Sequence, residues 1–251
     1  MADLWEVARS NPYLSAGILL ALGAVLVACW GAAEALWRLI LAAACALGMI
    51  TLIHLGRHSA QWPFAAPRVA LAAIGTAIGL WGLVHGPLNR LSKALHALAV
   101  ALGLGAFLLV PASSAPGAQR WGTLFGLAEI AYVLAAAALW HGVISAGASR
   151  ERPEATIRPA FGAALLLLTA ALLLYGLGAQ WAWGAYWSWE PLACWWLAAW
   201  LVVALAASLA EHLGWASRWA TLSLWIAACF SLGVLLGSLP LVQGLGLNGQ
   251  Y

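Results

Sequence analysis

Charged residues are the scarcest component of this 251-residue sequence. They make up only 8% of it, whereas 65% of its residues are hydrophobic, and the mean hydropathy is +0.92. Water is not the main solvent of such a chain, so a large water-soluble domain is excluded. The composition predicts an all-α polytopic membrane protein built from helices of about 20 apolar residues.

Cysteines are also few and are never paired in the sequence. Cys29, Cys45, Cys194 and Cys229 occur singly in apolar segments, with no C-x-x-C pair and no C-x-x-C-H motif. This pattern supports neither a redox dithiol nor a covalently attached c-type haem. Small buried apolar side chains are the simpler interpretation.

Polar, proline and glycine breaks divide the chain into apolar runs long enough to span a bilayer. The predicted spans are 12–31, 35–55, 69–88, 94–111, 121–145, 160–180, 192–210 and 220–242. The first break is the weakest, which leaves seven spans as the alternative. Pro153 and Pro159 are expected to mark a loop. We interpret residues 1–251 as a single transmembrane helical domain.

The distribution of basic residues predicts how the chain crosses the membrane. With eight spans, one side holds Arg9, Arg57, Arg68 and Arg120, and the other holds Arg38, Arg90, Lys93, Arg150, Arg152, Arg158 and Arg218. Because cationic loops stay in the cytoplasm, both termini are expected to be extracytoplasmic, in the cytoplasmic (inner) membrane. The first apolar run lacks a small-residue cleavage site and is expected to be retained. Scattered cations give no nucleic-acid patch.

A tryptophan-rich segment between the sixth and seventh predicted spans is the most specific feature. Residues 181–191 read WAWGAYWSWEP, and four of the chain's seventeen tryptophans fall within this segment. If the segment is helical, Trp183, Trp187 and Glu190 share one face. They would form a flat aromatic shelf with a carboxylate at its edge, which suits a large planar conjugated ring. An ordinary aromatic belt at the membrane interface is the alternative.

The segment WGAYWSWEP, from Trp183 to Pro191, resembles the W-G-x-x-W-x-W-D signature of the haem-handling (WWD-domain) proteins of cytochrome c maturation, of the CcsA/CcmC type. Glu190 stands where the signature has aspartate. The resemblance is closest over the loop 181–196 and looser, in span order, over residues 50–251. It implies that haem b is held noncovalently by Trp183, Gly184, Trp187, Trp189 and Glu190.

The resemblance also implies a role and partners. Haem would be presented at the extracytoplasmic face for attachment to apocytochrome c, together with a partner membrane subunit. Any enzyme activity, as part of a cytochrome c haem lyase, is implied by the resemblance alone. The protein would contribute ligation and orientation of the cofactor.

Histidines are the expected ligands of haem iron. The family's outward ligand positions align near residues 121–125 and 247–251, where this sequence has no histidine. His54 and His58 lie on the same predicted side as the tryptophan-rich loop and are candidates to replace them. Polar residues at the membrane interface are the alternative interpretation of both.

Four further histidines, His85, His96, His141 and His212, fall at the inward ends of predicted spans. As a set they offer the two imidazoles that bis-histidine ligation needs. His212 resembles an intramembrane histidine of the family by its place in span order, and we pair it with His85 as the predicted iron ligands. Hydrogen-bonded interfacial histidines are the alternative.

Glu129 is an acid inside the fifth predicted span. A carboxyl at this depth needs a partner or a use. A hydrogen bond to Tyr132 or to a neighbouring span is one explanation, and a proton or cation path is the other.

Two other classes of function compete with haem handling. A noncatalytic membrane subunit or paralogue would use the aromatic shelf to bind a partner, a lipid or a quinone. The missing outward histidines favour that class, whereas the intact W-G-x-x-W-x-W core favours haem. A transporter would show broken spans at matching positions of two halves, and no such symmetry occurs in the sequence.

Overall fold

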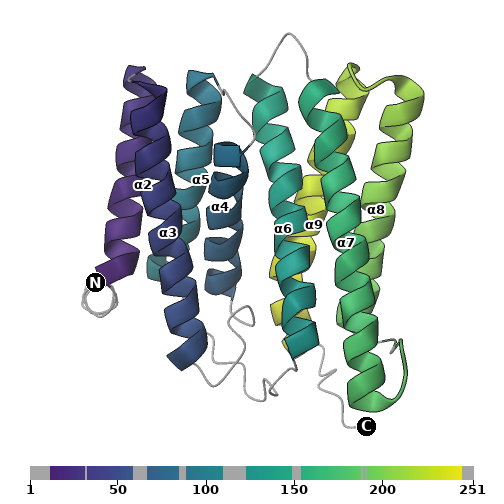
Figure 1. The fold of residues 1–251 in the computed structure, drawn as a ribbon. Coiled ribbons are helices and arrows are strands. Elements are labelled where there is room, and N and C mark those ends of the chain that lie inside the picture. Colours follow the sequence, from purple (N-terminus) through teal and green to yellow (C-terminus); the bar gives the residue numbers. More distant parts are fainter. Residues whose placement is uncertain are drawn as a thin grey trace. The chain divides into compact units, whose positions relative to one another are not determined.

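The computed structural model describes residues 12–31, 33–58, 67–84, 89–109, 123–148, 154–187, 189 and 191–244. These residues contain eight α-helices and no strand (Figure 1). The helices are α2 (Pro12–Trp30), α3 (Glu34–His58), α4 (Pro67–Val84), α5 (Arg90–Leu109), α6 (Thr123–Ala148), α7 (Glu154–Trp183), α8 (Pro191–Leu213) and α9 (Arg218–Gly244). Each matches one predicted span, so the all-α fold class is confirmed.

Membrane character follows from the length and composition of these helices. Within the part of the chain that the structure describes, α2, α3, α6, α7, α8 and α9 are long and apolar enough to cross a membrane, and α4 is a shorter apolar helix over Val69–Val84. Helices satisfy their own backbone polar groups, which lipid cannot do. Six helices rather than the predicted eight meet both conditions, and the protein is a multi-pass membrane protein.

Several helices begin at residues suited to a helix N-terminus. Pro12, Pro67 and Pro191 are the first residues of α2, α4 and α8, where the missing N–H costs no hydrogen bond. The Asn89 side chain accepts a hydrogen bond from the Ser92 N–H (2.9 Å) just before α5. Ser217 does the same for the Ala220 N–H (3.2 Å) before α9. Such caps satisfy otherwise unpaired amide groups.

Pro159 is the clearest difference from the predicted boundaries. It was expected in a loop, but α7 begins at Glu154 and includes it. A proline at this position removes one helical hydrogen bond, the one to the carbonyl of Ala155. Both residues are exposed, so water can hydrogen-bond that carbonyl near the end of the helix. The sequence rule for proline therefore placed the start of α7 too late.

The chain divides into two compact units, which are described separately. The first contains α2–α5, and the second contains α6, up to Ala146, and α7–α9. Within each unit the helices run side by side along a common direction (Figure 1). In the second unit α7 and α8 pack together, as do α8 and α9. The single domain proposed over residues 1–251 stays a prediction.

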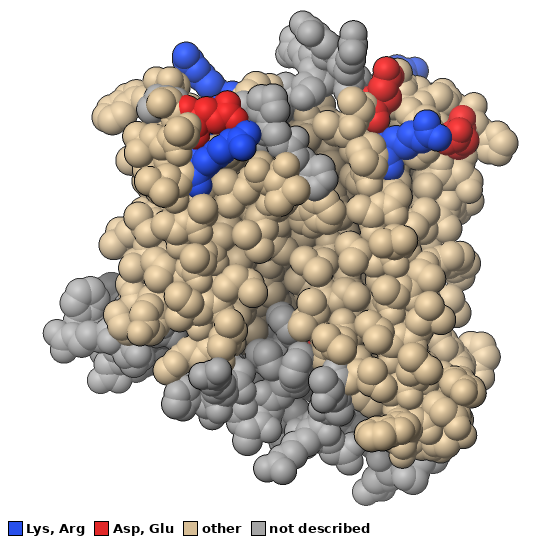
Figure 2. All heavy atoms as spheres, viewed as in Figure 1, with Lys and Arg blue, Asp and Glu red and all other residues tan. Residues whose placement is uncertain are grey.

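Charged side chains gather at one end of each unit (Figure 2). In the first unit this end is formed by the starts of α3 and α5, and in the second by the starts of α7 and α9 and the end of α8. The described side chains involved are Glu34, Arg38, Arg90 and Lys93 in the first unit, and Glu154, Arg158, Glu211 and Arg218 in the second. Apart from Glu129 of α6, the described charged side chains lie at helix ends, which fits helices that cross hydrocarbon and end among headgroups.

Glycines allow the closest helix contact of the first unit. A Cβ atom built on Gly75 of α4 would lie 2.5 Å from the Ala99 carbonyl oxygen and 3.0 Å from the Gly103 Cα of α5. Both neighbours are backbone atoms, so no side chain can turn away to make room. Small residues at such crossings let membrane helices approach closely and gain packing energy.

Gly75→Ala is therefore expected to separate α4 from α5 and to lower the free energy of unfolding by about 1–3 kcal/mol. The matched control is Gly105→Ala on α5, where a Cβ would meet nothing within 4 Å. Unfolding of the purified protein by titration with sodium dodecyl sulfate measures both changes. Equal stability of the two variants would contradict the close crossing.

Candidate functional site

The tryptophan-rich loop begins where α7 ends, at Trp183. Gly184 has a φ of 72°, a left-handed conformation that side chains other than glycine rarely adopt. Its N–H donates to the Gln180 carbonyl (3.0 Å), which closes the last turn of α7. Residues 185–187 and 189 are not helical, and α8 starts at Pro191. The conditional helical stripe of Trp183, Trp187 and Glu190 is therefore not formed.

Instead, the loop folds back towards α7. A Cβ on Gly176 would lie 3.1 Å from the Tyr186 carbonyl oxygen, so the loop backbone runs close to the helix there. Two residues further along, the ring of Phe125 lies against Gly178, within 3.2–3.3 Å of where a Cβ would be. These two glycines make room for the loop and for α6, and sequence reasoning missed both. The spacing G-x-G beside Tyr175 was the available signal.

Three tryptophans of the loop have rings at its surface or just below it. Trp189 is 81% exposed and Trp183 is 49% exposed, while Trp187 is less so. The Trp187 and Trp189 ring centres are 6.1 Å apart, with the rings nearly perpendicular at 83°. Trp183 lies 5.4 Å from Phe125, at 47°. The rings thus present faces and edges in different directions and do not form one flat shelf.

Buried aromatic rings support these tryptophans from below. Tyr175 of α7 lies 6.4 Å from Trp187, 5.3 Å from Phe125 and 5.9 Å from Trp196 of α8. Trp196 stacks on Tyr132 of α6 at 5.1 Å and 23°. We call this set the aromatic network, and its members are Phe125, Tyr132, Tyr175, Trp183, Trp187, Trp189 and Trp196. Its rings connect the exposed loop to the interior of the second unit without a break.

A hydrogen bond ties the lower part of the network to a fourth helix. The Tyr132 hydroxyl, fully buried, donates to the Ser231 carbonyl of α9 at 3.1 Å. Tyr132 therefore contacts α8 through its ring and α9 through its hydroxyl. A buried tyrosine needs such a partner, because an unpaired hydroxyl in an apolar interior is costly.

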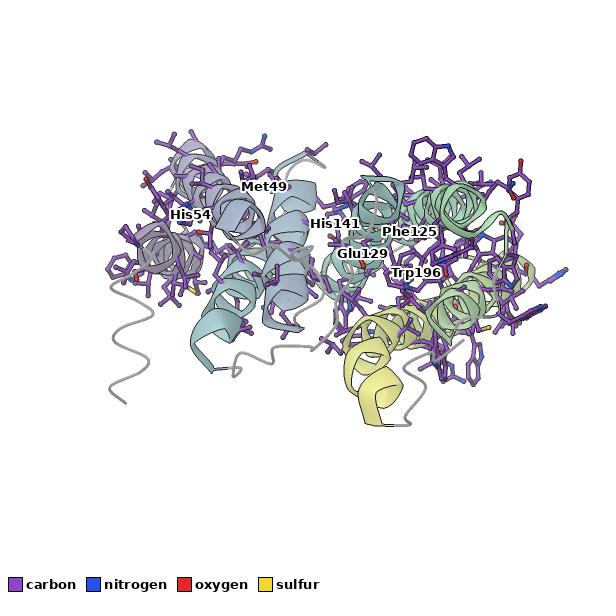
Figure 3. All side chains as sticks on the ribbon, turned by 90° about the horizontal axis from the view of Figure 1, so that it is seen from below. Met49, His54, Phe125, Glu129, His141 and Trp196 are labelled. Atoms are coloured by element: carbon purple, nitrogen blue, oxygen red, sulfur yellow. The ribbon has the colours of Figure 1, made fainter. Side chains whose placement is uncertain are left out.

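Glu129 lies between Phe125 and Tyr132 on the same face of α6, four residues after the first and three before the second. Its Oε2 atom is buried. Figure 3 looks along the helices and shows Phe125, Glu129 and Trp196 grouped between the helices of the second unit. The helix spacing thus places this carboxyl beside the aromatic network, within the membrane span predicted from the sequence.

The structure places the predicted site residues at several locations. Trp183, Gly184, Trp187 and Trp189 are together in the loop, whereas Glu190 and His85 lie outside the described residues. His54 and His58 lie on α3 of the first unit, where the side chain of His54 is exposed. Their proposed role beside the loop stays a prediction.

His212 is at the opposite end of α8 from the loop. It lies 21 residues after Pro191, which corresponds to about 30 Å along a helix. An imidazole at that distance does not reach the tryptophans. In the described part of the chain, no group of three or more histidine, cysteine or acidic side chains is arranged to hold a metal ion.

His96 illustrates the alternative interpretation of the inward histidines. Its side chain is fully buried in the first unit, and its Nδ1 lies 2.7 Å from the Ser92 carbonyl oxygen. The ring fills the space beside Gly82, where a Cβ would lie 2.5 Å from the His96 Cδ2. A histidine packed and hydrogen-bonded in this way stabilises its helix pair.

Comparison of the chain with protein-family models, with curated proteins and with solved structures gives no match. The resemblance of the tryptophan-rich segment to haem-handling proteins therefore rests on its own residues. The fold and the site together define an all-α polytopic membrane protein with a supported cluster of tryptophans at one end of a four-helix unit.

We expect two substitutions to separate the contributions of the ring and the hydroxyl in the aromatic network. Trp196→Ala removes the ring that contacts both Tyr132 and Tyr175 and should lower the free energy of unfolding by about 3–5 kcal/mol. Tyr132→Phe keeps the stacked ring, loses only the hydrogen bond to Ser231, and should cost about 0.5–1.5 kcal/mol. Detergent unfolding monitored by circular dichroism tests this order, and a larger loss for Tyr132→Phe would refute it.

Gly184→Ala should loosen the start of the loop. No atom obstructs a Cβ there, so the cost comes from the left-handed backbone and is about 1–2 kcal/mol. Gly162→Ala on α7 is the matched control, because it also has open space but no positive φ. Limited proteolysis of the loop should accelerate only in Gly184→Ala, and equal rates in both variants would argue against the cap.

Proposed function

We propose that this protein is a haem-handling membrane protein of cytochrome c biogenesis. It holds haem b noncovalently against Trp183, Gly184, Trp187, Trp189 and Glu190 and presents it at the extracytoplasmic face for attachment to apocytochrome c. The carrying observation is the placement of three surface tryptophans on a buried aromatic foundation. That foundation fixes the indoles before any ligand arrives and so lowers the entropic cost of binding.

The described residues of the loop offer surfaces for the porphyrin ring of haem but no axial ligand for its iron. Large apolar ring faces and edges near the surface suit stacking against a porphyrin. The iron also needs an axial ligand, and the two described histidines of the second unit, His141 and His212, lie far from the loop along α6 and α8. The candidates for a ligand beside the loop are therefore His54 and His58, and His85 with His212 stays the predicted pair at the inward end.

The chain's own contribution is to bind and orient. The indoles of Trp183 and Trp187 offer apolar surface, and Glu190, which follows Trp189 in the sequence, offers a carboxylate. Bound haem supplies the groups to which the thiols of an apocytochrome C-x-x-C-H are joined. In this proposal the termini and the loop are extracytoplasmic, the membrane is the cytoplasmic (inner) membrane, and a partner membrane subunit completes the assembly.

A second function is favoured by the distance of His141 and His212 from the tryptophans. A noncatalytic subunit needs no iron ligand and would use the same indoles to bind a partner, a lipid or a quinone. The two functions differ in a single observable, the presence of haem in the purified protein.

An optical spectrum of the detergent-purified protein, oxidised and reduced, tests the proposal. A Soret band is expected, and Trp187→Ala should weaken haem binding about 3- to 10-fold, which corresponds to about 0.5–1.5 kcal/mol for one aromatic contact. Glu190→Gln should weaken it as well. Trp219→Ala, an exposed tryptophan at the start of α9, is the matched control and should leave the band unchanged.

The same spectrum identifies the axial ligands. The band should be lost in His85→Ala or in the His54→Ala/His58→Ala double variant, with His212→Ala as the comparison for the inward end. Unchanged haem occupancy and unchanged maturation of a c-type cytochrome in both Trp187→Ala and Glu190→Gln would disprove a haem site at the loop. Absence of a Soret band from haem-replete cells would favour the noncatalytic subunit.

A further inference from the structure

The charged end of the first unit carries more positive than negative side chains. Arg38 lies near the start of α3, Arg90 and Lys93 lie at the start of α5, and Glu34 is the first residue of α3. We call these four residues the basic cluster. Three cations and one carboxylate leave an excess of positive charge among the described side chains at this end.

The single carboxylate of the cluster is already occupied. The Oε1 atom of Glu34 accepts hydrogen bonds from the Arg38 Nε (3.0 Å) and from a second guanidinium nitrogen (2.7 Å). Its Oε2 lies 3.4 Å from the Lys93 Nζ. Lys93 is also 5.7 Å from the centre of the buried Trp37 ring. These contacts hold the cations of α3 and α5 together.

Arg90 is the cation without such a carboxylate. Its side chain is exposed, and its guanidinium lies over Gly31, within 2.5–2.7 Å of where a Cβ would stand. Gly31 has a φ of 70° and ends α2, so the bare backbone of that turn leaves room for the guanidinium. Among the described side chains no carboxylate forms an ion pair with Arg90. Its hydrogen-bond donors therefore suit an anion from outside the chain.

The second unit shows that this excess is not a general feature of the charged ends. There the described end carries Glu154 and Glu211 against Arg158 and Arg218, so acidic and basic side chains balance. Glu211 accepts a hydrogen bond from the Trp215 Nε1 (2.6 Å), and Arg218 lies over the Trp219 ring. Among the described side chains, an excess of positive over negative charge is thus found at the charged end of the first unit and not at that of the second.

The surroundings of the basic cluster match the boundary between lipid headgroups and acyl chains. α2 has 19 residues, about 28 Å of helix, close to the roughly 30 Å of a hydrocarbon core. A helix of this length that spans the hydrocarbon core would place Gly31 and the cluster at headgroup depth. Trp30 is 88% exposed, and Leu36 and Leu91 are exposed apolar side chains next to the cations. Tryptophan is typical of this interface.

We infer that the basic cluster binds the phosphate headgroup of an anionic phospholipid, with Arg90 as the main contact. A guanidinium offers paired N–H donors that match phosphate oxygens. Lys93 and Arg38 add positive charge nearby, and Trp30, Leu36 and Leu91 lie against the acyl chains. Basic residues at the ends of membrane helices recognise anionic lipids by this combination of charge and apolar surface. The inference does not depend on the function proposed for the tryptophan-rich loop.

Native mass spectrometry of the full chain in detergent, with added phosphatidylglycerol or phosphatidylcholine, measures retained lipid directly. The wild-type protein should retain phosphatidylglycerol in preference to phosphatidylcholine. Arg90→Gln should weaken phosphatidylglycerol retention about fivefold, the effect of one interfacial cation. Arg158→Gln, which removes an exposed cation of the balanced end, is the matched control and should change nothing.

Additional measurements distinguish lipid binding from misfolding of a variant and from binding of free phosphate. Arg90→Lys keeps the charge and should retain an intermediate amount of phosphatidylglycerol, and retention of phosphatidylcholine by all variants shows that they are folded. Inorganic phosphate at the same concentration should not displace the lipid. Three results would each overturn the inference. The first is equal retention of the two lipids by the wild type, and the second is an equal loss of phosphatidylglycerol in Arg90→Gln and Arg158→Gln. The third is displacement of phosphatidylglycerol by inorganic phosphate.

Discussion

Ring contacts hold the helices of the second unit together, and the loop at its end depends on them. Phe125 connects α6 to α7 and Tyr132 connects α6 to α8. The Tyr132 hydroxyl then extends the same contact to α9. Lipid is as apolar as leucine, so membrane helices associate through close packing and buried hydrogen bonds. The aromatic network supplies both, from the tryptophans of the loop down to Tyr132 in the interior of the second unit.

Glycines allow close helix contacts in both units, and large rings add to these contacts in the second. In the first, Gly75 and Gly103 bring the backbones of α4 and α5 into direct contact. In the second, Trp196, Tyr132 and Tyr175 fill the space between α6, α7 and α8. The large rings of the second unit extend from its interior to the loop at its surface. The glycine crossing of α4 and α5 instead places backbone against backbone. Among the described residues, the tryptophans of the loop rest on buried rings of the second unit.

The loop carries exposed tryptophans above buried aromatic rings. Trp189 and Trp183 are accessible, while Tyr175 and Trp196 beneath them are buried. The loop itself is delimited by Gly184, which ends α7, and by Pro191, which starts α8. The indoles of Trp183 and Trp187 are positioned by their contacts with the buried rings of Phe125 and Tyr175. That arrangement leaves indole faces and edges accessible at the surface of the second unit.

The sequence by itself predicted the eight helices of the described residues, their approximate bounds and the polytopic membrane class, because hydrophobic runs of bilayer length have almost no other stable structure. It also located the tryptophan-rich loop. It did not reveal that Gly184 ends α7 and abolishes the helical stripe, nor that Phe125, Tyr175 and Trp196 support the loop. Which rings touch depends on helix packing between segments far apart in sequence, and only the tertiary structure decides that.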